Sequence, residues 1–406
     1  MTAKAIAYLC SQYPAISHTF IYREIESLRK AGITVHTASI RQPENLAVMT
    51  PAEQEEANRT LMVLSMPFPS MLGAHWHCLK KNPAGYLRMA AEALRLLTSG
   101  PKSPLKAVAY FTEAGILLRW LHQHNITHIH EHFANPTAIV AILMKSYGGV
   151  SYSISVHGPD IFYTVDSAML AEKIRKAAFV RCISYYCLSQ IMRISAPAAW
   201  QKLHIVRCGV DPELYTPRAE PGNAIPHLLC VGRLVAAKGQ YILLEACALL
   251  KREGLQFQLT IVGDGPDRAV LEKAATSLNL DGSVTFTGAL GQDKVRDVYE
   301  RADLFVLASF AEGVPVVLME AMAKEIAVIS TRITGIPELI EHEKDGLLAT
   351  PGDEADLASQ IRKLLANPQQ RRELGTAGRK KVIALYNQHT NNQGMATLFE
   401  KEELTA

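Results

Sequence analysis

Two glutamates, Glu312 and Glu320, stand eight positions apart in an otherwise apolar segment of the C-terminal third. The run 303–309 before them predicts a short buried strand, and Pro315 suits the first position of a helix that is apolar almost all the way round. Glu312 is therefore expected on a strand-to-helix loop and Glu320 inside the helix. In open α/β sheets such loops form the ligand crevice. Because carboxylates only accept hydrogen bonds, the pair predicts a ligand rich in hydroxyl groups.

A purely structural role for the two carboxylates is the alternative. Glu312 near a helix N-terminus is favourable through the helix dipole alone, and Glu320 with Lys324 would form an ordinary i,i+4 pair. However, Glu320 is the only charged residue between Val314 and Ala323. A buried carboxylate without a partner is costly, so we expect something to compensate it and favour a binding function.

The size and composition of the chain predict a soluble globular protein of two domains. Its 406 residues exceed one typical hydrophobic core, and a net charge of +3 gives no reason to expect a dedicated nucleic-acid surface. The seven cysteines form no Cys-x-x-Cys pair and are expected to be reduced core thiols. An apolar run of eighteen residues does not occur, so no membrane-spanning helix is expected.

Short β-rich runs alternate with longer helical patterns along nearly the whole chain, which predicts parallel sheets with crossover helices. The expected strands are 5–10, 35–40, 128–133, 152–157, 179–184, 203–208, 228–232, 258–263, 284–288, 304–308, 327–331 and 346–349. The proline-rich segment 211–226 separates the two series and is the expected linker. The fold class is therefore α/β, with two Rossmann-like domains, 1–215 and 216–386, facing across a cleft.

Two cations, Arg233 and Lys238, follow the first strand of the second domain on a glycine-containing loop. An arginine fork and a compact ammonium beside exposed backbone suit a diphosphate, although two ordinary surface cations are the alternative. A second glycine turn at 263–266 lacks the full G-x-G-x-x-G pattern, so a nicotinamide cofactor is not supported. The loop after the third strand of this domain offers backbone groups to a nucleobase, so Leu290 on that loop, together with Gly263, is an expected nucleobase contact.

Histidines mark the carboxyl ends of two strands in the first domain. His157 follows a strand and precedes small residues, so we expect it to face the cleft; a hydrogen-bonded loop histidine is the alternative. Period-two geometry places His128, His130 and His132 on one face of a strand. Their spacing separates the outer imidazoles too far for a zinc site without another element. With no Asp-x-Asp triplet, we expect positive side chains to stabilise a leaving diphosphate, and no catalytic metal.

Together these motifs resemble the retaining glycosyltransferases of family four, which have the GT-B architecture. The resemblance covers nearly the whole chain. It is carried by Gly232-Arg233, Lys238-Gly239, 263–266, the two glutamates with Gly313 and Pro315 between them, 334–338 and 345–346. The segments 13–21, 24–25 and 130–134 resemble the branch that builds bacterial exopolysaccharides of the colanic-acid type.

The resemblance implies roles for the matching positions. Arg233 and Lys238 would bind the donor diphosphate, and Glu320 would bind the ribose hydroxyls. The donor sugar would contact Glu312, Gly313, Val314 and His157, with His157 near the reacting carbon, and the acceptor would contact Ser17, His18 and Thr19. The segment 387–406 would form a helix that crosses back onto the first domain.

The implied activity is transfer of a hexose, with retention, from a nucleoside diphosphate sugar to a hydroxyl of a glycan or lipid-linked acceptor. No cofactor is expected beside this donor, and a UDP-sugar is favoured over a GDP-sugar. A sugar-nucleotide epimerase and a catalytically silent scaffold of a polysaccharide assembly are the alternatives. A cytoplasmic location is expected. The basic and aromatic segment 42–125 gives a secondary hypothesis of contact with an anionic membrane, for which a solvated helix is the alternative.

Overall fold

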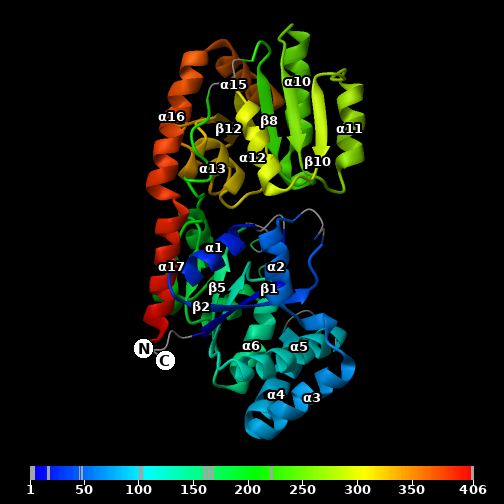
Figure 1. The fold of residues 1–406 in the computed structure, drawn as a ribbon, viewed down its shortest axis with the longest axis vertical. Coiled ribbons are helices and arrows are strands. Elements are labelled where there is room, and N and C mark those ends of the chain that lie inside the picture. The colour runs from blue at the N-terminus through cyan, green and yellow to red at the C-terminus, as the bar shows by residue number, and fades with distance from the viewer. Residues whose placement is uncertain are drawn as a thin grey trace. The chain divides into compact units, whose positions relative to one another are not determined.

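The computed structural model describes residues 5–15, 19–44, 46, 49–99, 104–158, 162, 165, 169–219 and 223–403. The chain forms two compact units, drawn in Figure 1. Unit 1 comprises Met1–Val206 and Asn392–Ala406, and unit 2 comprises Arg207–Asn391. These limits lie near the domain boundaries expected after residues 215 and 386.

Unit 1 is built on a seven-stranded sheet in which all neighbouring strands run parallel, in the order β3-β2-β1-β4-β5-β6-β7. Its strands are β1 (Ala5–Gln12), β2 (Thr34–Arg41), β3 (Leu61–Met62), β4 (His128–His132), β5 (Ser151–Val156), β6 (Val180–Cys182) and β7 (Leu203–Ile205). Its helices are α1 (Thr19–Lys30), α2 (Pro51–Arg59), α3 (Phe68–Lys81), α4 (Pro83–Ser99), α5 (Pro104–Gln123), α6 (Thr137–Tyr147), α8 (Leu170–Lys176) and α9 (Tyr185–Ile194), with short 3-10 turns at η3 (Val63–Ser65) and η4 (Pro197–Lys202).

Unit 2 has a six-stranded parallel sheet in the order β10-β9-β8-β11-β12-β13. Its strands are β8 (His227–Val231), β9 (Gln258–Val262), β10 (Val284–Gly288), β11 (Leu304–Leu307), β12 (Ala327–Thr331) and β13 (Leu347–Ala349). Its helices are η5 (Ala236–Lys238), α10 (Gln240–Arg252), α11 (Arg268–Ser277), α12 (Gln292–Arg301), α13 (Val316–Ala323), α14 (Ile336–Leu339), α15 (Glu354–Ala366) and α16 (Pro368–Leu385). The final helix, α17 (Gln388–Glu403), begins in unit 2 and belongs to unit 1 from Asn392.

The strand order of each sheet reverses direction once. In unit 1 the chain passes from β1 to β2 and β3 and then returns, so that β4 pairs with the other side of β1. In unit 2 the chain passes from β8 to β9 and β10 and then returns, so that β11 pairs with the other side of β8. At such a switch point the loops after the two neighbouring strands turn to opposite faces, which leaves a crevice at their carboxyl ends. Each sheet therefore has one position where a ligand site is expected.

The expected α/β class is confirmed, and each of the twelve expected strands overlaps an observed strand. The observed strand β3 was not expected, because it has two residues and therefore no periodic pattern from which it could be predicted. Pro315 is the N-cap of α13, one position before the helix starts, while Glu312 and Glu320 lie on the loop and in the helix as expected. All seven cysteines are buried and free, as predicted. Among the helices of the described residues, none is long and apolar enough to cross a bilayer.

One face of the unit 1 sheet is closed by α1 and the last helix. Met395, Leu398 and Phe399 of α17 are buried in a cluster with Ile6 and Tyr8 of β1. The Phe399 ring lies 5.4 Å from the imidazole of His130 and 5.6 Å from the ring of Phe179, measured between centroids. These three residues of α17 are thus part of the core of unit 1.

We expect Phe399→Ala to lower the free energy of unfolding of unit 1 by about 3–5 kcal/mol, because it leaves a cavity in this aromatic cluster. All three tryptophans of the chain lie in unit 1, so their fluorescence during urea denaturation reports this unit. The matched control, Thr397→Ala on the exposed side of α17, should change the free energy by less than about 0.5 kcal/mol. Equal effects of the two substitutions would contradict the assigned packing.

Candidate functional site

The switch point of unit 2 brings together side chains from the loops after β8 and β11. The ammonium Nζ of Lys238 lies 2.6 Å from Oε1 of Glu312. The hydroxyl of Ser309 donates to the same oxygen at 2.7 Å. The Glu312 side chain is 8% exposed and that of Lys238 is 24% exposed, so the carboxylate is buried while the lysine is partly accessible to solvent.

The way these bonds are shared leaves specific capacity for a ligand. Both hydrogen bonds to the Glu312 carboxylate end on Oε1, and within the described part of the chain Oε2 receives none. Oε2 can therefore accept a hydrogen bond from a ligand hydroxyl. The ammonium of Lys238 has three donors and gives one to Glu312, so it can also bind an anion. Thr334 donates its hydroxyl to the Glu312 carbonyl oxygen, which fixes the loop.

Close backbone contacts between loops require glycine at two positions. Gly239 has φ +60°, and a Cβ there would lie 2.1 Å from the carbonyl oxygen of Ala308. Gly263 has φ +139°, and a Cβ there would lie 1.9 Å from the carbonyl oxygen of Gly232. The turn at Gly263, predicted from its sequence as a nucleobase contact, is thus packed against the loop that carries Arg233. Both glycines allow loops from neighbouring strands to share one edge of the sheet.

The other predicted donor-site residues lie on the same edge. Arg233 is exposed, and its carbonyl oxygen accepts from Gln240 at 2.8 Å. Gly313 is partly buried and Val314 is buried, directly after Glu312. Leu290, on the loop between β10 and α12, is partly buried. The roles of these residues in binding a donor stay predictions.

The second glutamate has partners that the sequence did not indicate. Oε1 of Glu320 accepts from the Tyr215 hydroxyl at 2.7 Å, and Oε2 lies 3.2 Å from the Tyr299 hydroxyl. The alternative pairing of Glu320 with Lys324 is wrong, because the Lys324 ammonium bonds to Glu300 instead. Two neutral hydroxyls thus compensate the buried carboxylate. Burial and then the charge of Glu320 raise the pKa of Tyr299 well above its usual value.

The switch point of unit 1 holds a second group of buried polar side chains. His157, which follows β5, lies with Nε2 at 2.8 Å from Nδ1 of His132. The two rings are stacked, and His157 also packs on Phe20 and Phe133. With 8% of its surface exposed, His157 is buried against a second imidazole and two aromatic rings. Its expected position facing the cleft stays a prediction.

Behind His132 lies an ion pair between α1 and β6. Arg181 donates to Oε2 of Glu24, and Tyr8 donates to Oε1 at 2.7 Å. All three side chains are buried. Burial alone would raise the pKa of Glu24, but the Arg181 guanidinium and the neighbouring imidazoles hold it well below its usual range. The carboxylate is therefore ionised inside the unit. Arg181 was not predicted as a site residue, although a charged residue within the expected strand 179–184 is a signal that could have indicated it.

The alternating histidines of β4 face the neighbouring strand as a ladder. His128 contacts the hydroxyls of Ser151 and Ser153, each at 2.8 Å. His130 contacts those of Ser153 and Ser155, each at 2.7 Å. The predicted common face of the three histidines is thus confirmed, with serines at every second position of β5 as partners.

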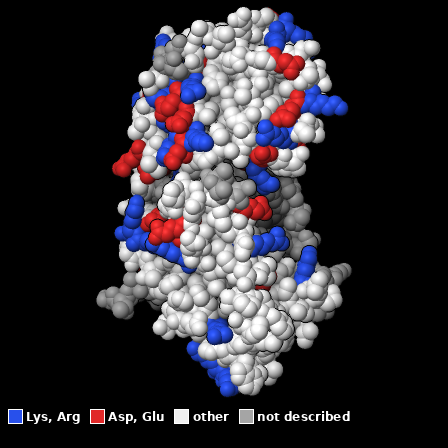
Figure 2. Space-filling view, turned by 45° about the vertical axis from the view of Figure 1, so that its right-hand side comes forward, with Lys and Arg blue, Asp and Glu red and all other residues white. Residues whose placement is uncertain are grey.

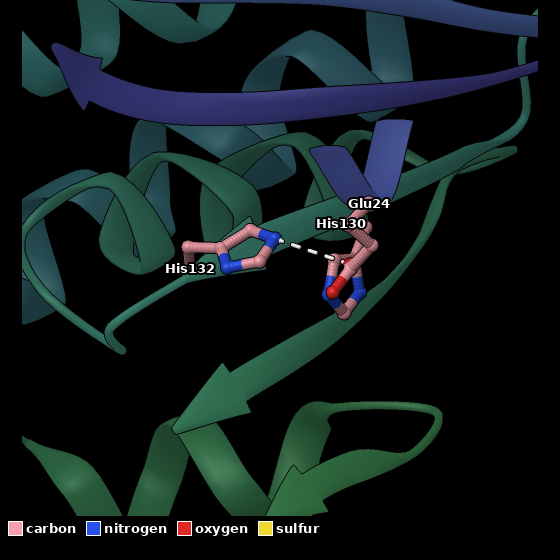
Figure 3. A group of neighbouring side chains, drawn as sticks. All are labelled: Glu24, His130 and His132. Carbon is pink, nitrogen blue, oxygen red and sulfur yellow. Dashed lines mark ion pairs between the residues drawn. The ribbon is translucent and has the colours of Figure 1, made fainter. Parts of the chain in front are cut away.

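Glu24 approaches two of these histidines, an approach that spacing along the strand could not predict. Figure 3 shows the carboxylate of Glu24 and the imidazoles of His130 and His132 together, and their nearest ligand atoms all lie within 4.8 Å of one another. Such a group has the composition of a metal site. However, both nitrogens of His130 and both oxygens of Glu24 already have hydrogen-bond partners. This favours a hydrogen-bond network over a metal site.

The network also sets the tautomer of His157. Burial lowers the pKa of both His132 and His157, so both rings are neutral near pH 7. Nε2 of His132 lies 3.6 Å from the Glu24 carboxylate, too far for a hydrogen bond but close enough that a proton on this nitrogen is favoured. Nδ1 of His132 then accepts from Nε2 of His157. The remaining nitrogen of His157, Nδ1, is consequently a hydrogen-bond acceptor.

Of the predicted acceptor residues, Ser17 and His18 lie outside the described residues. Thr19 is the first residue of α1 and is 9% exposed. Its predicted contact with an acceptor is not tested by its position.

Comparison with known proteins gives consistent matches. Residues 221–381 match the family model described as "Glycosyl transferases group 1". The amylovoran biosynthesis glycosyltransferase AmsK of Erwinia amylovora is 34% identical over 219 residues, which are 52% of this chain and 53% of that protein; the match spans about half the length of that relative. The putative colanic acid biosynthesis glycosyltransferase WcaL of Escherichia coli K12 is 25% identical, with 97% of this chain and 99% of WcaL covered.

A similar fold occurs in the crystal structure of Anabaena Alr3699/HepE in complex with UDP-glucose. The TM-score is 0.72 with 19% sequence identity, and 98% of this chain and 99% of that chain are covered. The two Rossmann-like units of this chain have the GT-B fold that this structure shares. The match of residues 221–381 to the glycosyl transferases group 1 model, together with the relatives AmsK and WcaL, supports the family that the resemblance of the motifs predicted.

We expect Glu24→Gln to destabilise unit 1 by about 3–5 kcal/mol, because it leaves the Arg181 charge buried without a counter-ion. The measurement is urea denaturation followed by tryptophan fluorescence. The double variant Glu24→Gln/Arg181→Met should recover a large part of the loss, since it removes both charges. Additive losses in the double variant would show that the ion pair is not the source of the effect.

Unit 1 should become less stable as the pH falls below about 6.5, because the buried imidazole of His130 is harder to protonate in the folded state than in the unfolded state. Its folded pKa is lowered by burial, so its stabilising contribution is complete above the unfolded pKa and is lost below it at about 1.4 kcal/mol per pH unit. Burial raises the pKa of Glu113 to about 7 and also raises that of Glu131, and these groups act in the opposite direction. The test is therefore the difference between wild type and His130→Asn from pH 7.5 to about 5.5. The difference should shrink as the pH falls, while the exposed control His124→Asn should follow wild type; a constant difference would contradict the prediction.

Proposed function

We propose that this glycosyltransferase moves a hexose from a nucleoside diphosphate sugar to a hydroxyl group of a glycan acceptor, with retention, during synthesis of a cell-surface polysaccharide. The names of the relatives AmsK and WcaL support the polysaccharide class. The fold shared with HepE, whose crystal structure contains UDP-glucose, supports a nucleotide-sugar donor and favours UDP over GDP.

The ion pair at the switch point of unit 2 is the observation that carries this proposal. A departing diphosphate gains negative charge, and the Lys238 ammonium, with the exposed guanidinium of Arg233 on the same loop, can neutralise it. Oε2 of Glu312 can meanwhile accept from a hydroxyl of the donor sugar. One residue pair therefore addresses both chemical parts of a nucleotide sugar.

The proposed transfer needs no side-chain nucleophile. The bond between the anomeric carbon and the diphosphate oxygen breaks, and its electron pair leaves with the diphosphate. The acceptor oxygen forms the new bond on the same face and passes its proton to a departing phosphate oxygen. Positive side chains stabilise the leaving group in this scheme, so we propose catalysis without a metal ion.

Three contacts of the donor remain part of the proposal. Glu320 would bind the ribose hydroxyls. These would bond to its oxygens either beside or in place of the two tyrosine hydroxyls from which the oxygens now accept hydrogen bonds. Gly263 and Leu290 would contact the nucleobase. His157 would contact the donor sugar near the reacting carbon. Peripheral contact with the membrane that carries a lipid-linked acceptor is also proposed.

An epimerase of the same fold would convert the donor in the absence of an acceptor, and a silent scaffold would bind the donor without releasing nucleotide. Incubation with nucleotide sugars, with and without lipid-linked acceptor extracts, separates the three functions. We expect acceptor-dependent nucleotide release and no new sugar nucleotide. A new sugar nucleotide formed from the donor alone would overturn the proposal.

Lys238→Met and Glu312→Gln should each lower kcat/KM for sugar transfer by about a hundredfold or more, since each removes a charged contact to the reacting donor. Lys251→Met is a suitable control because this exposed lysine lies in the last turn of α10, where its ammonium donates to the Asn279 carbonyl. It should retain wild-type activity. Full turnover by either site variant would defeat the assignment.

A further inference from the structure

Three large apolar side chains form an exposed stripe along α3. Phe68, Leu72 and Trp76 follow one another at intervals of four residues, which places them on one side of the helix. They are 70%, 57% and 58% exposed. The next position of the stripe is Lys80, whose ammonium lies 5.0 Å from the centre of the Trp76 ring. An apolar stripe that ends in a lysine faces solvent here, although the opposite side of α3 already supplies Ala74 and Cys78 to the core.

The helices packed against α3 expose further apolar side chains. Leu87 and Leu94 of α4 are 66% and 65% exposed, and Leu105 of α5 is 79% exposed. Eight of the eighteen exposed large apolar residues in the described chain lie between positions 64 and 108. Soluble proteins rarely concentrate apolar surface in this way without a binding partner.

The charge of this segment is almost entirely positive. Between residues 64 and 123 the sequence has seven lysines and arginines and only two acidic residues, Glu92 and Glu113. Glu113 is buried, and the carboxylate of Glu92 is paired with Arg95 and Lys176. On the face drawn in Figure 2, the lowest part of the molecule, which these helices form, shows basic side chains among neutral ones.

We propose that α3, with the adjoining exposed residues of α4 and α5, is a docking surface for an anionic lipid membrane. Phe68, Leu72 and Trp76 would enter the boundary between headgroups and acyl chains, where aromatic side chains are favoured. Lys80 and Lys81, at the end of the stripe, would contact the lipid phosphates.

The charge distribution favours a membrane over a second copy of the chain. In a two-fold dimer the same surface meets itself, so basic residues would face basic residues without acidic partners. An anionic bilayer offers both an apolar layer and negative phosphates over a wide area. This inference deepens the membrane contact proposed above by assigning it to a surface, and it does not depend on sugar transfer because it concerns lipid binding alone.

The test uses the full chain and vesicles of phosphatidylcholine with or without phosphatidylglycerol. The protein should sediment with the anionic vesicles, less so at high salt, and brominated lipids should quench its fluorescence. Trp76→Phe should lose most of that quenching, because Trp76 is the tryptophan on the stripe. No sedimentation with anionic vesicles would overturn the proposal.

A substitution pair makes the location of the surface testable. Leu72→Ser/Trp76→Ser should weaken vesicle binding by at least about tenfold. Tyr241→Ser/Val270→Ser removes two comparably exposed apolar side chains from α10 and α11 and should bind vesicles like wild type. Circular dichroism shows whether each variant is folded. If the stripe variant instead abolishes a dimer seen by sedimentation velocity, and vesicles bind equally well, the occupant is a second copy and the membrane proposal is wrong.

Discussion

The position of β11 beside β8 determines where the charged groups of unit 2 meet. These strands are far apart in the sequence, yet they are neighbours at the point where the strand order reverses. Their loops therefore share an edge of the sheet, and Lys238 reaches the carboxylate of Glu312 there. Gly239 permits the loops to approach because any larger residue would collide with the Ala308 carbonyl. The donor chemistry that we propose follows from this one adjacency.

Unit 1 uses its switch point differently. Its polar groups are buried as a connected network, in which the ionised Glu24 is balanced by Arg181 and the imidazoles remain neutral. A charge in such a place is tolerated only when its partner is fixed by the fold. The network orients His157, because Nδ1 of His132 lies 2.8 Å from Nε2 of His157. This contact favours the proton on Nε2 of His157 and leaves Nδ1 as the acceptor.

The two regions suggest a division of labour. Loops at the edge of unit 2 carry groups with unused hydrogen-bonding capacity, which suits a ligand that comes and goes. The helices α3 to α5 carry apolar and basic side chains that the fold of unit 1 does not need on its surface. A transferase whose acceptor is held in a membrane would require both features, one for the sugar nucleotide and one for the surface on which the acceptor lies.

Local sequence patterns indicated the described strands other than β3 and the positions of Glu312, Lys238 and His157 after strands, because hydrophobic periodicity and turn residues depend on near neighbours. The resemblance of short motifs also indicated the family. Only the tertiary structure decided the partners: Tyr215 reaches Glu320 across 105 positions, and Arg181 reaches Glu24 across 157. Such pairs are set by the order of strands in the sheets and by burial, because an unpaired buried charge is strongly destabilising. The spacing of residues within one segment cannot predict a partner that comes from a distant segment.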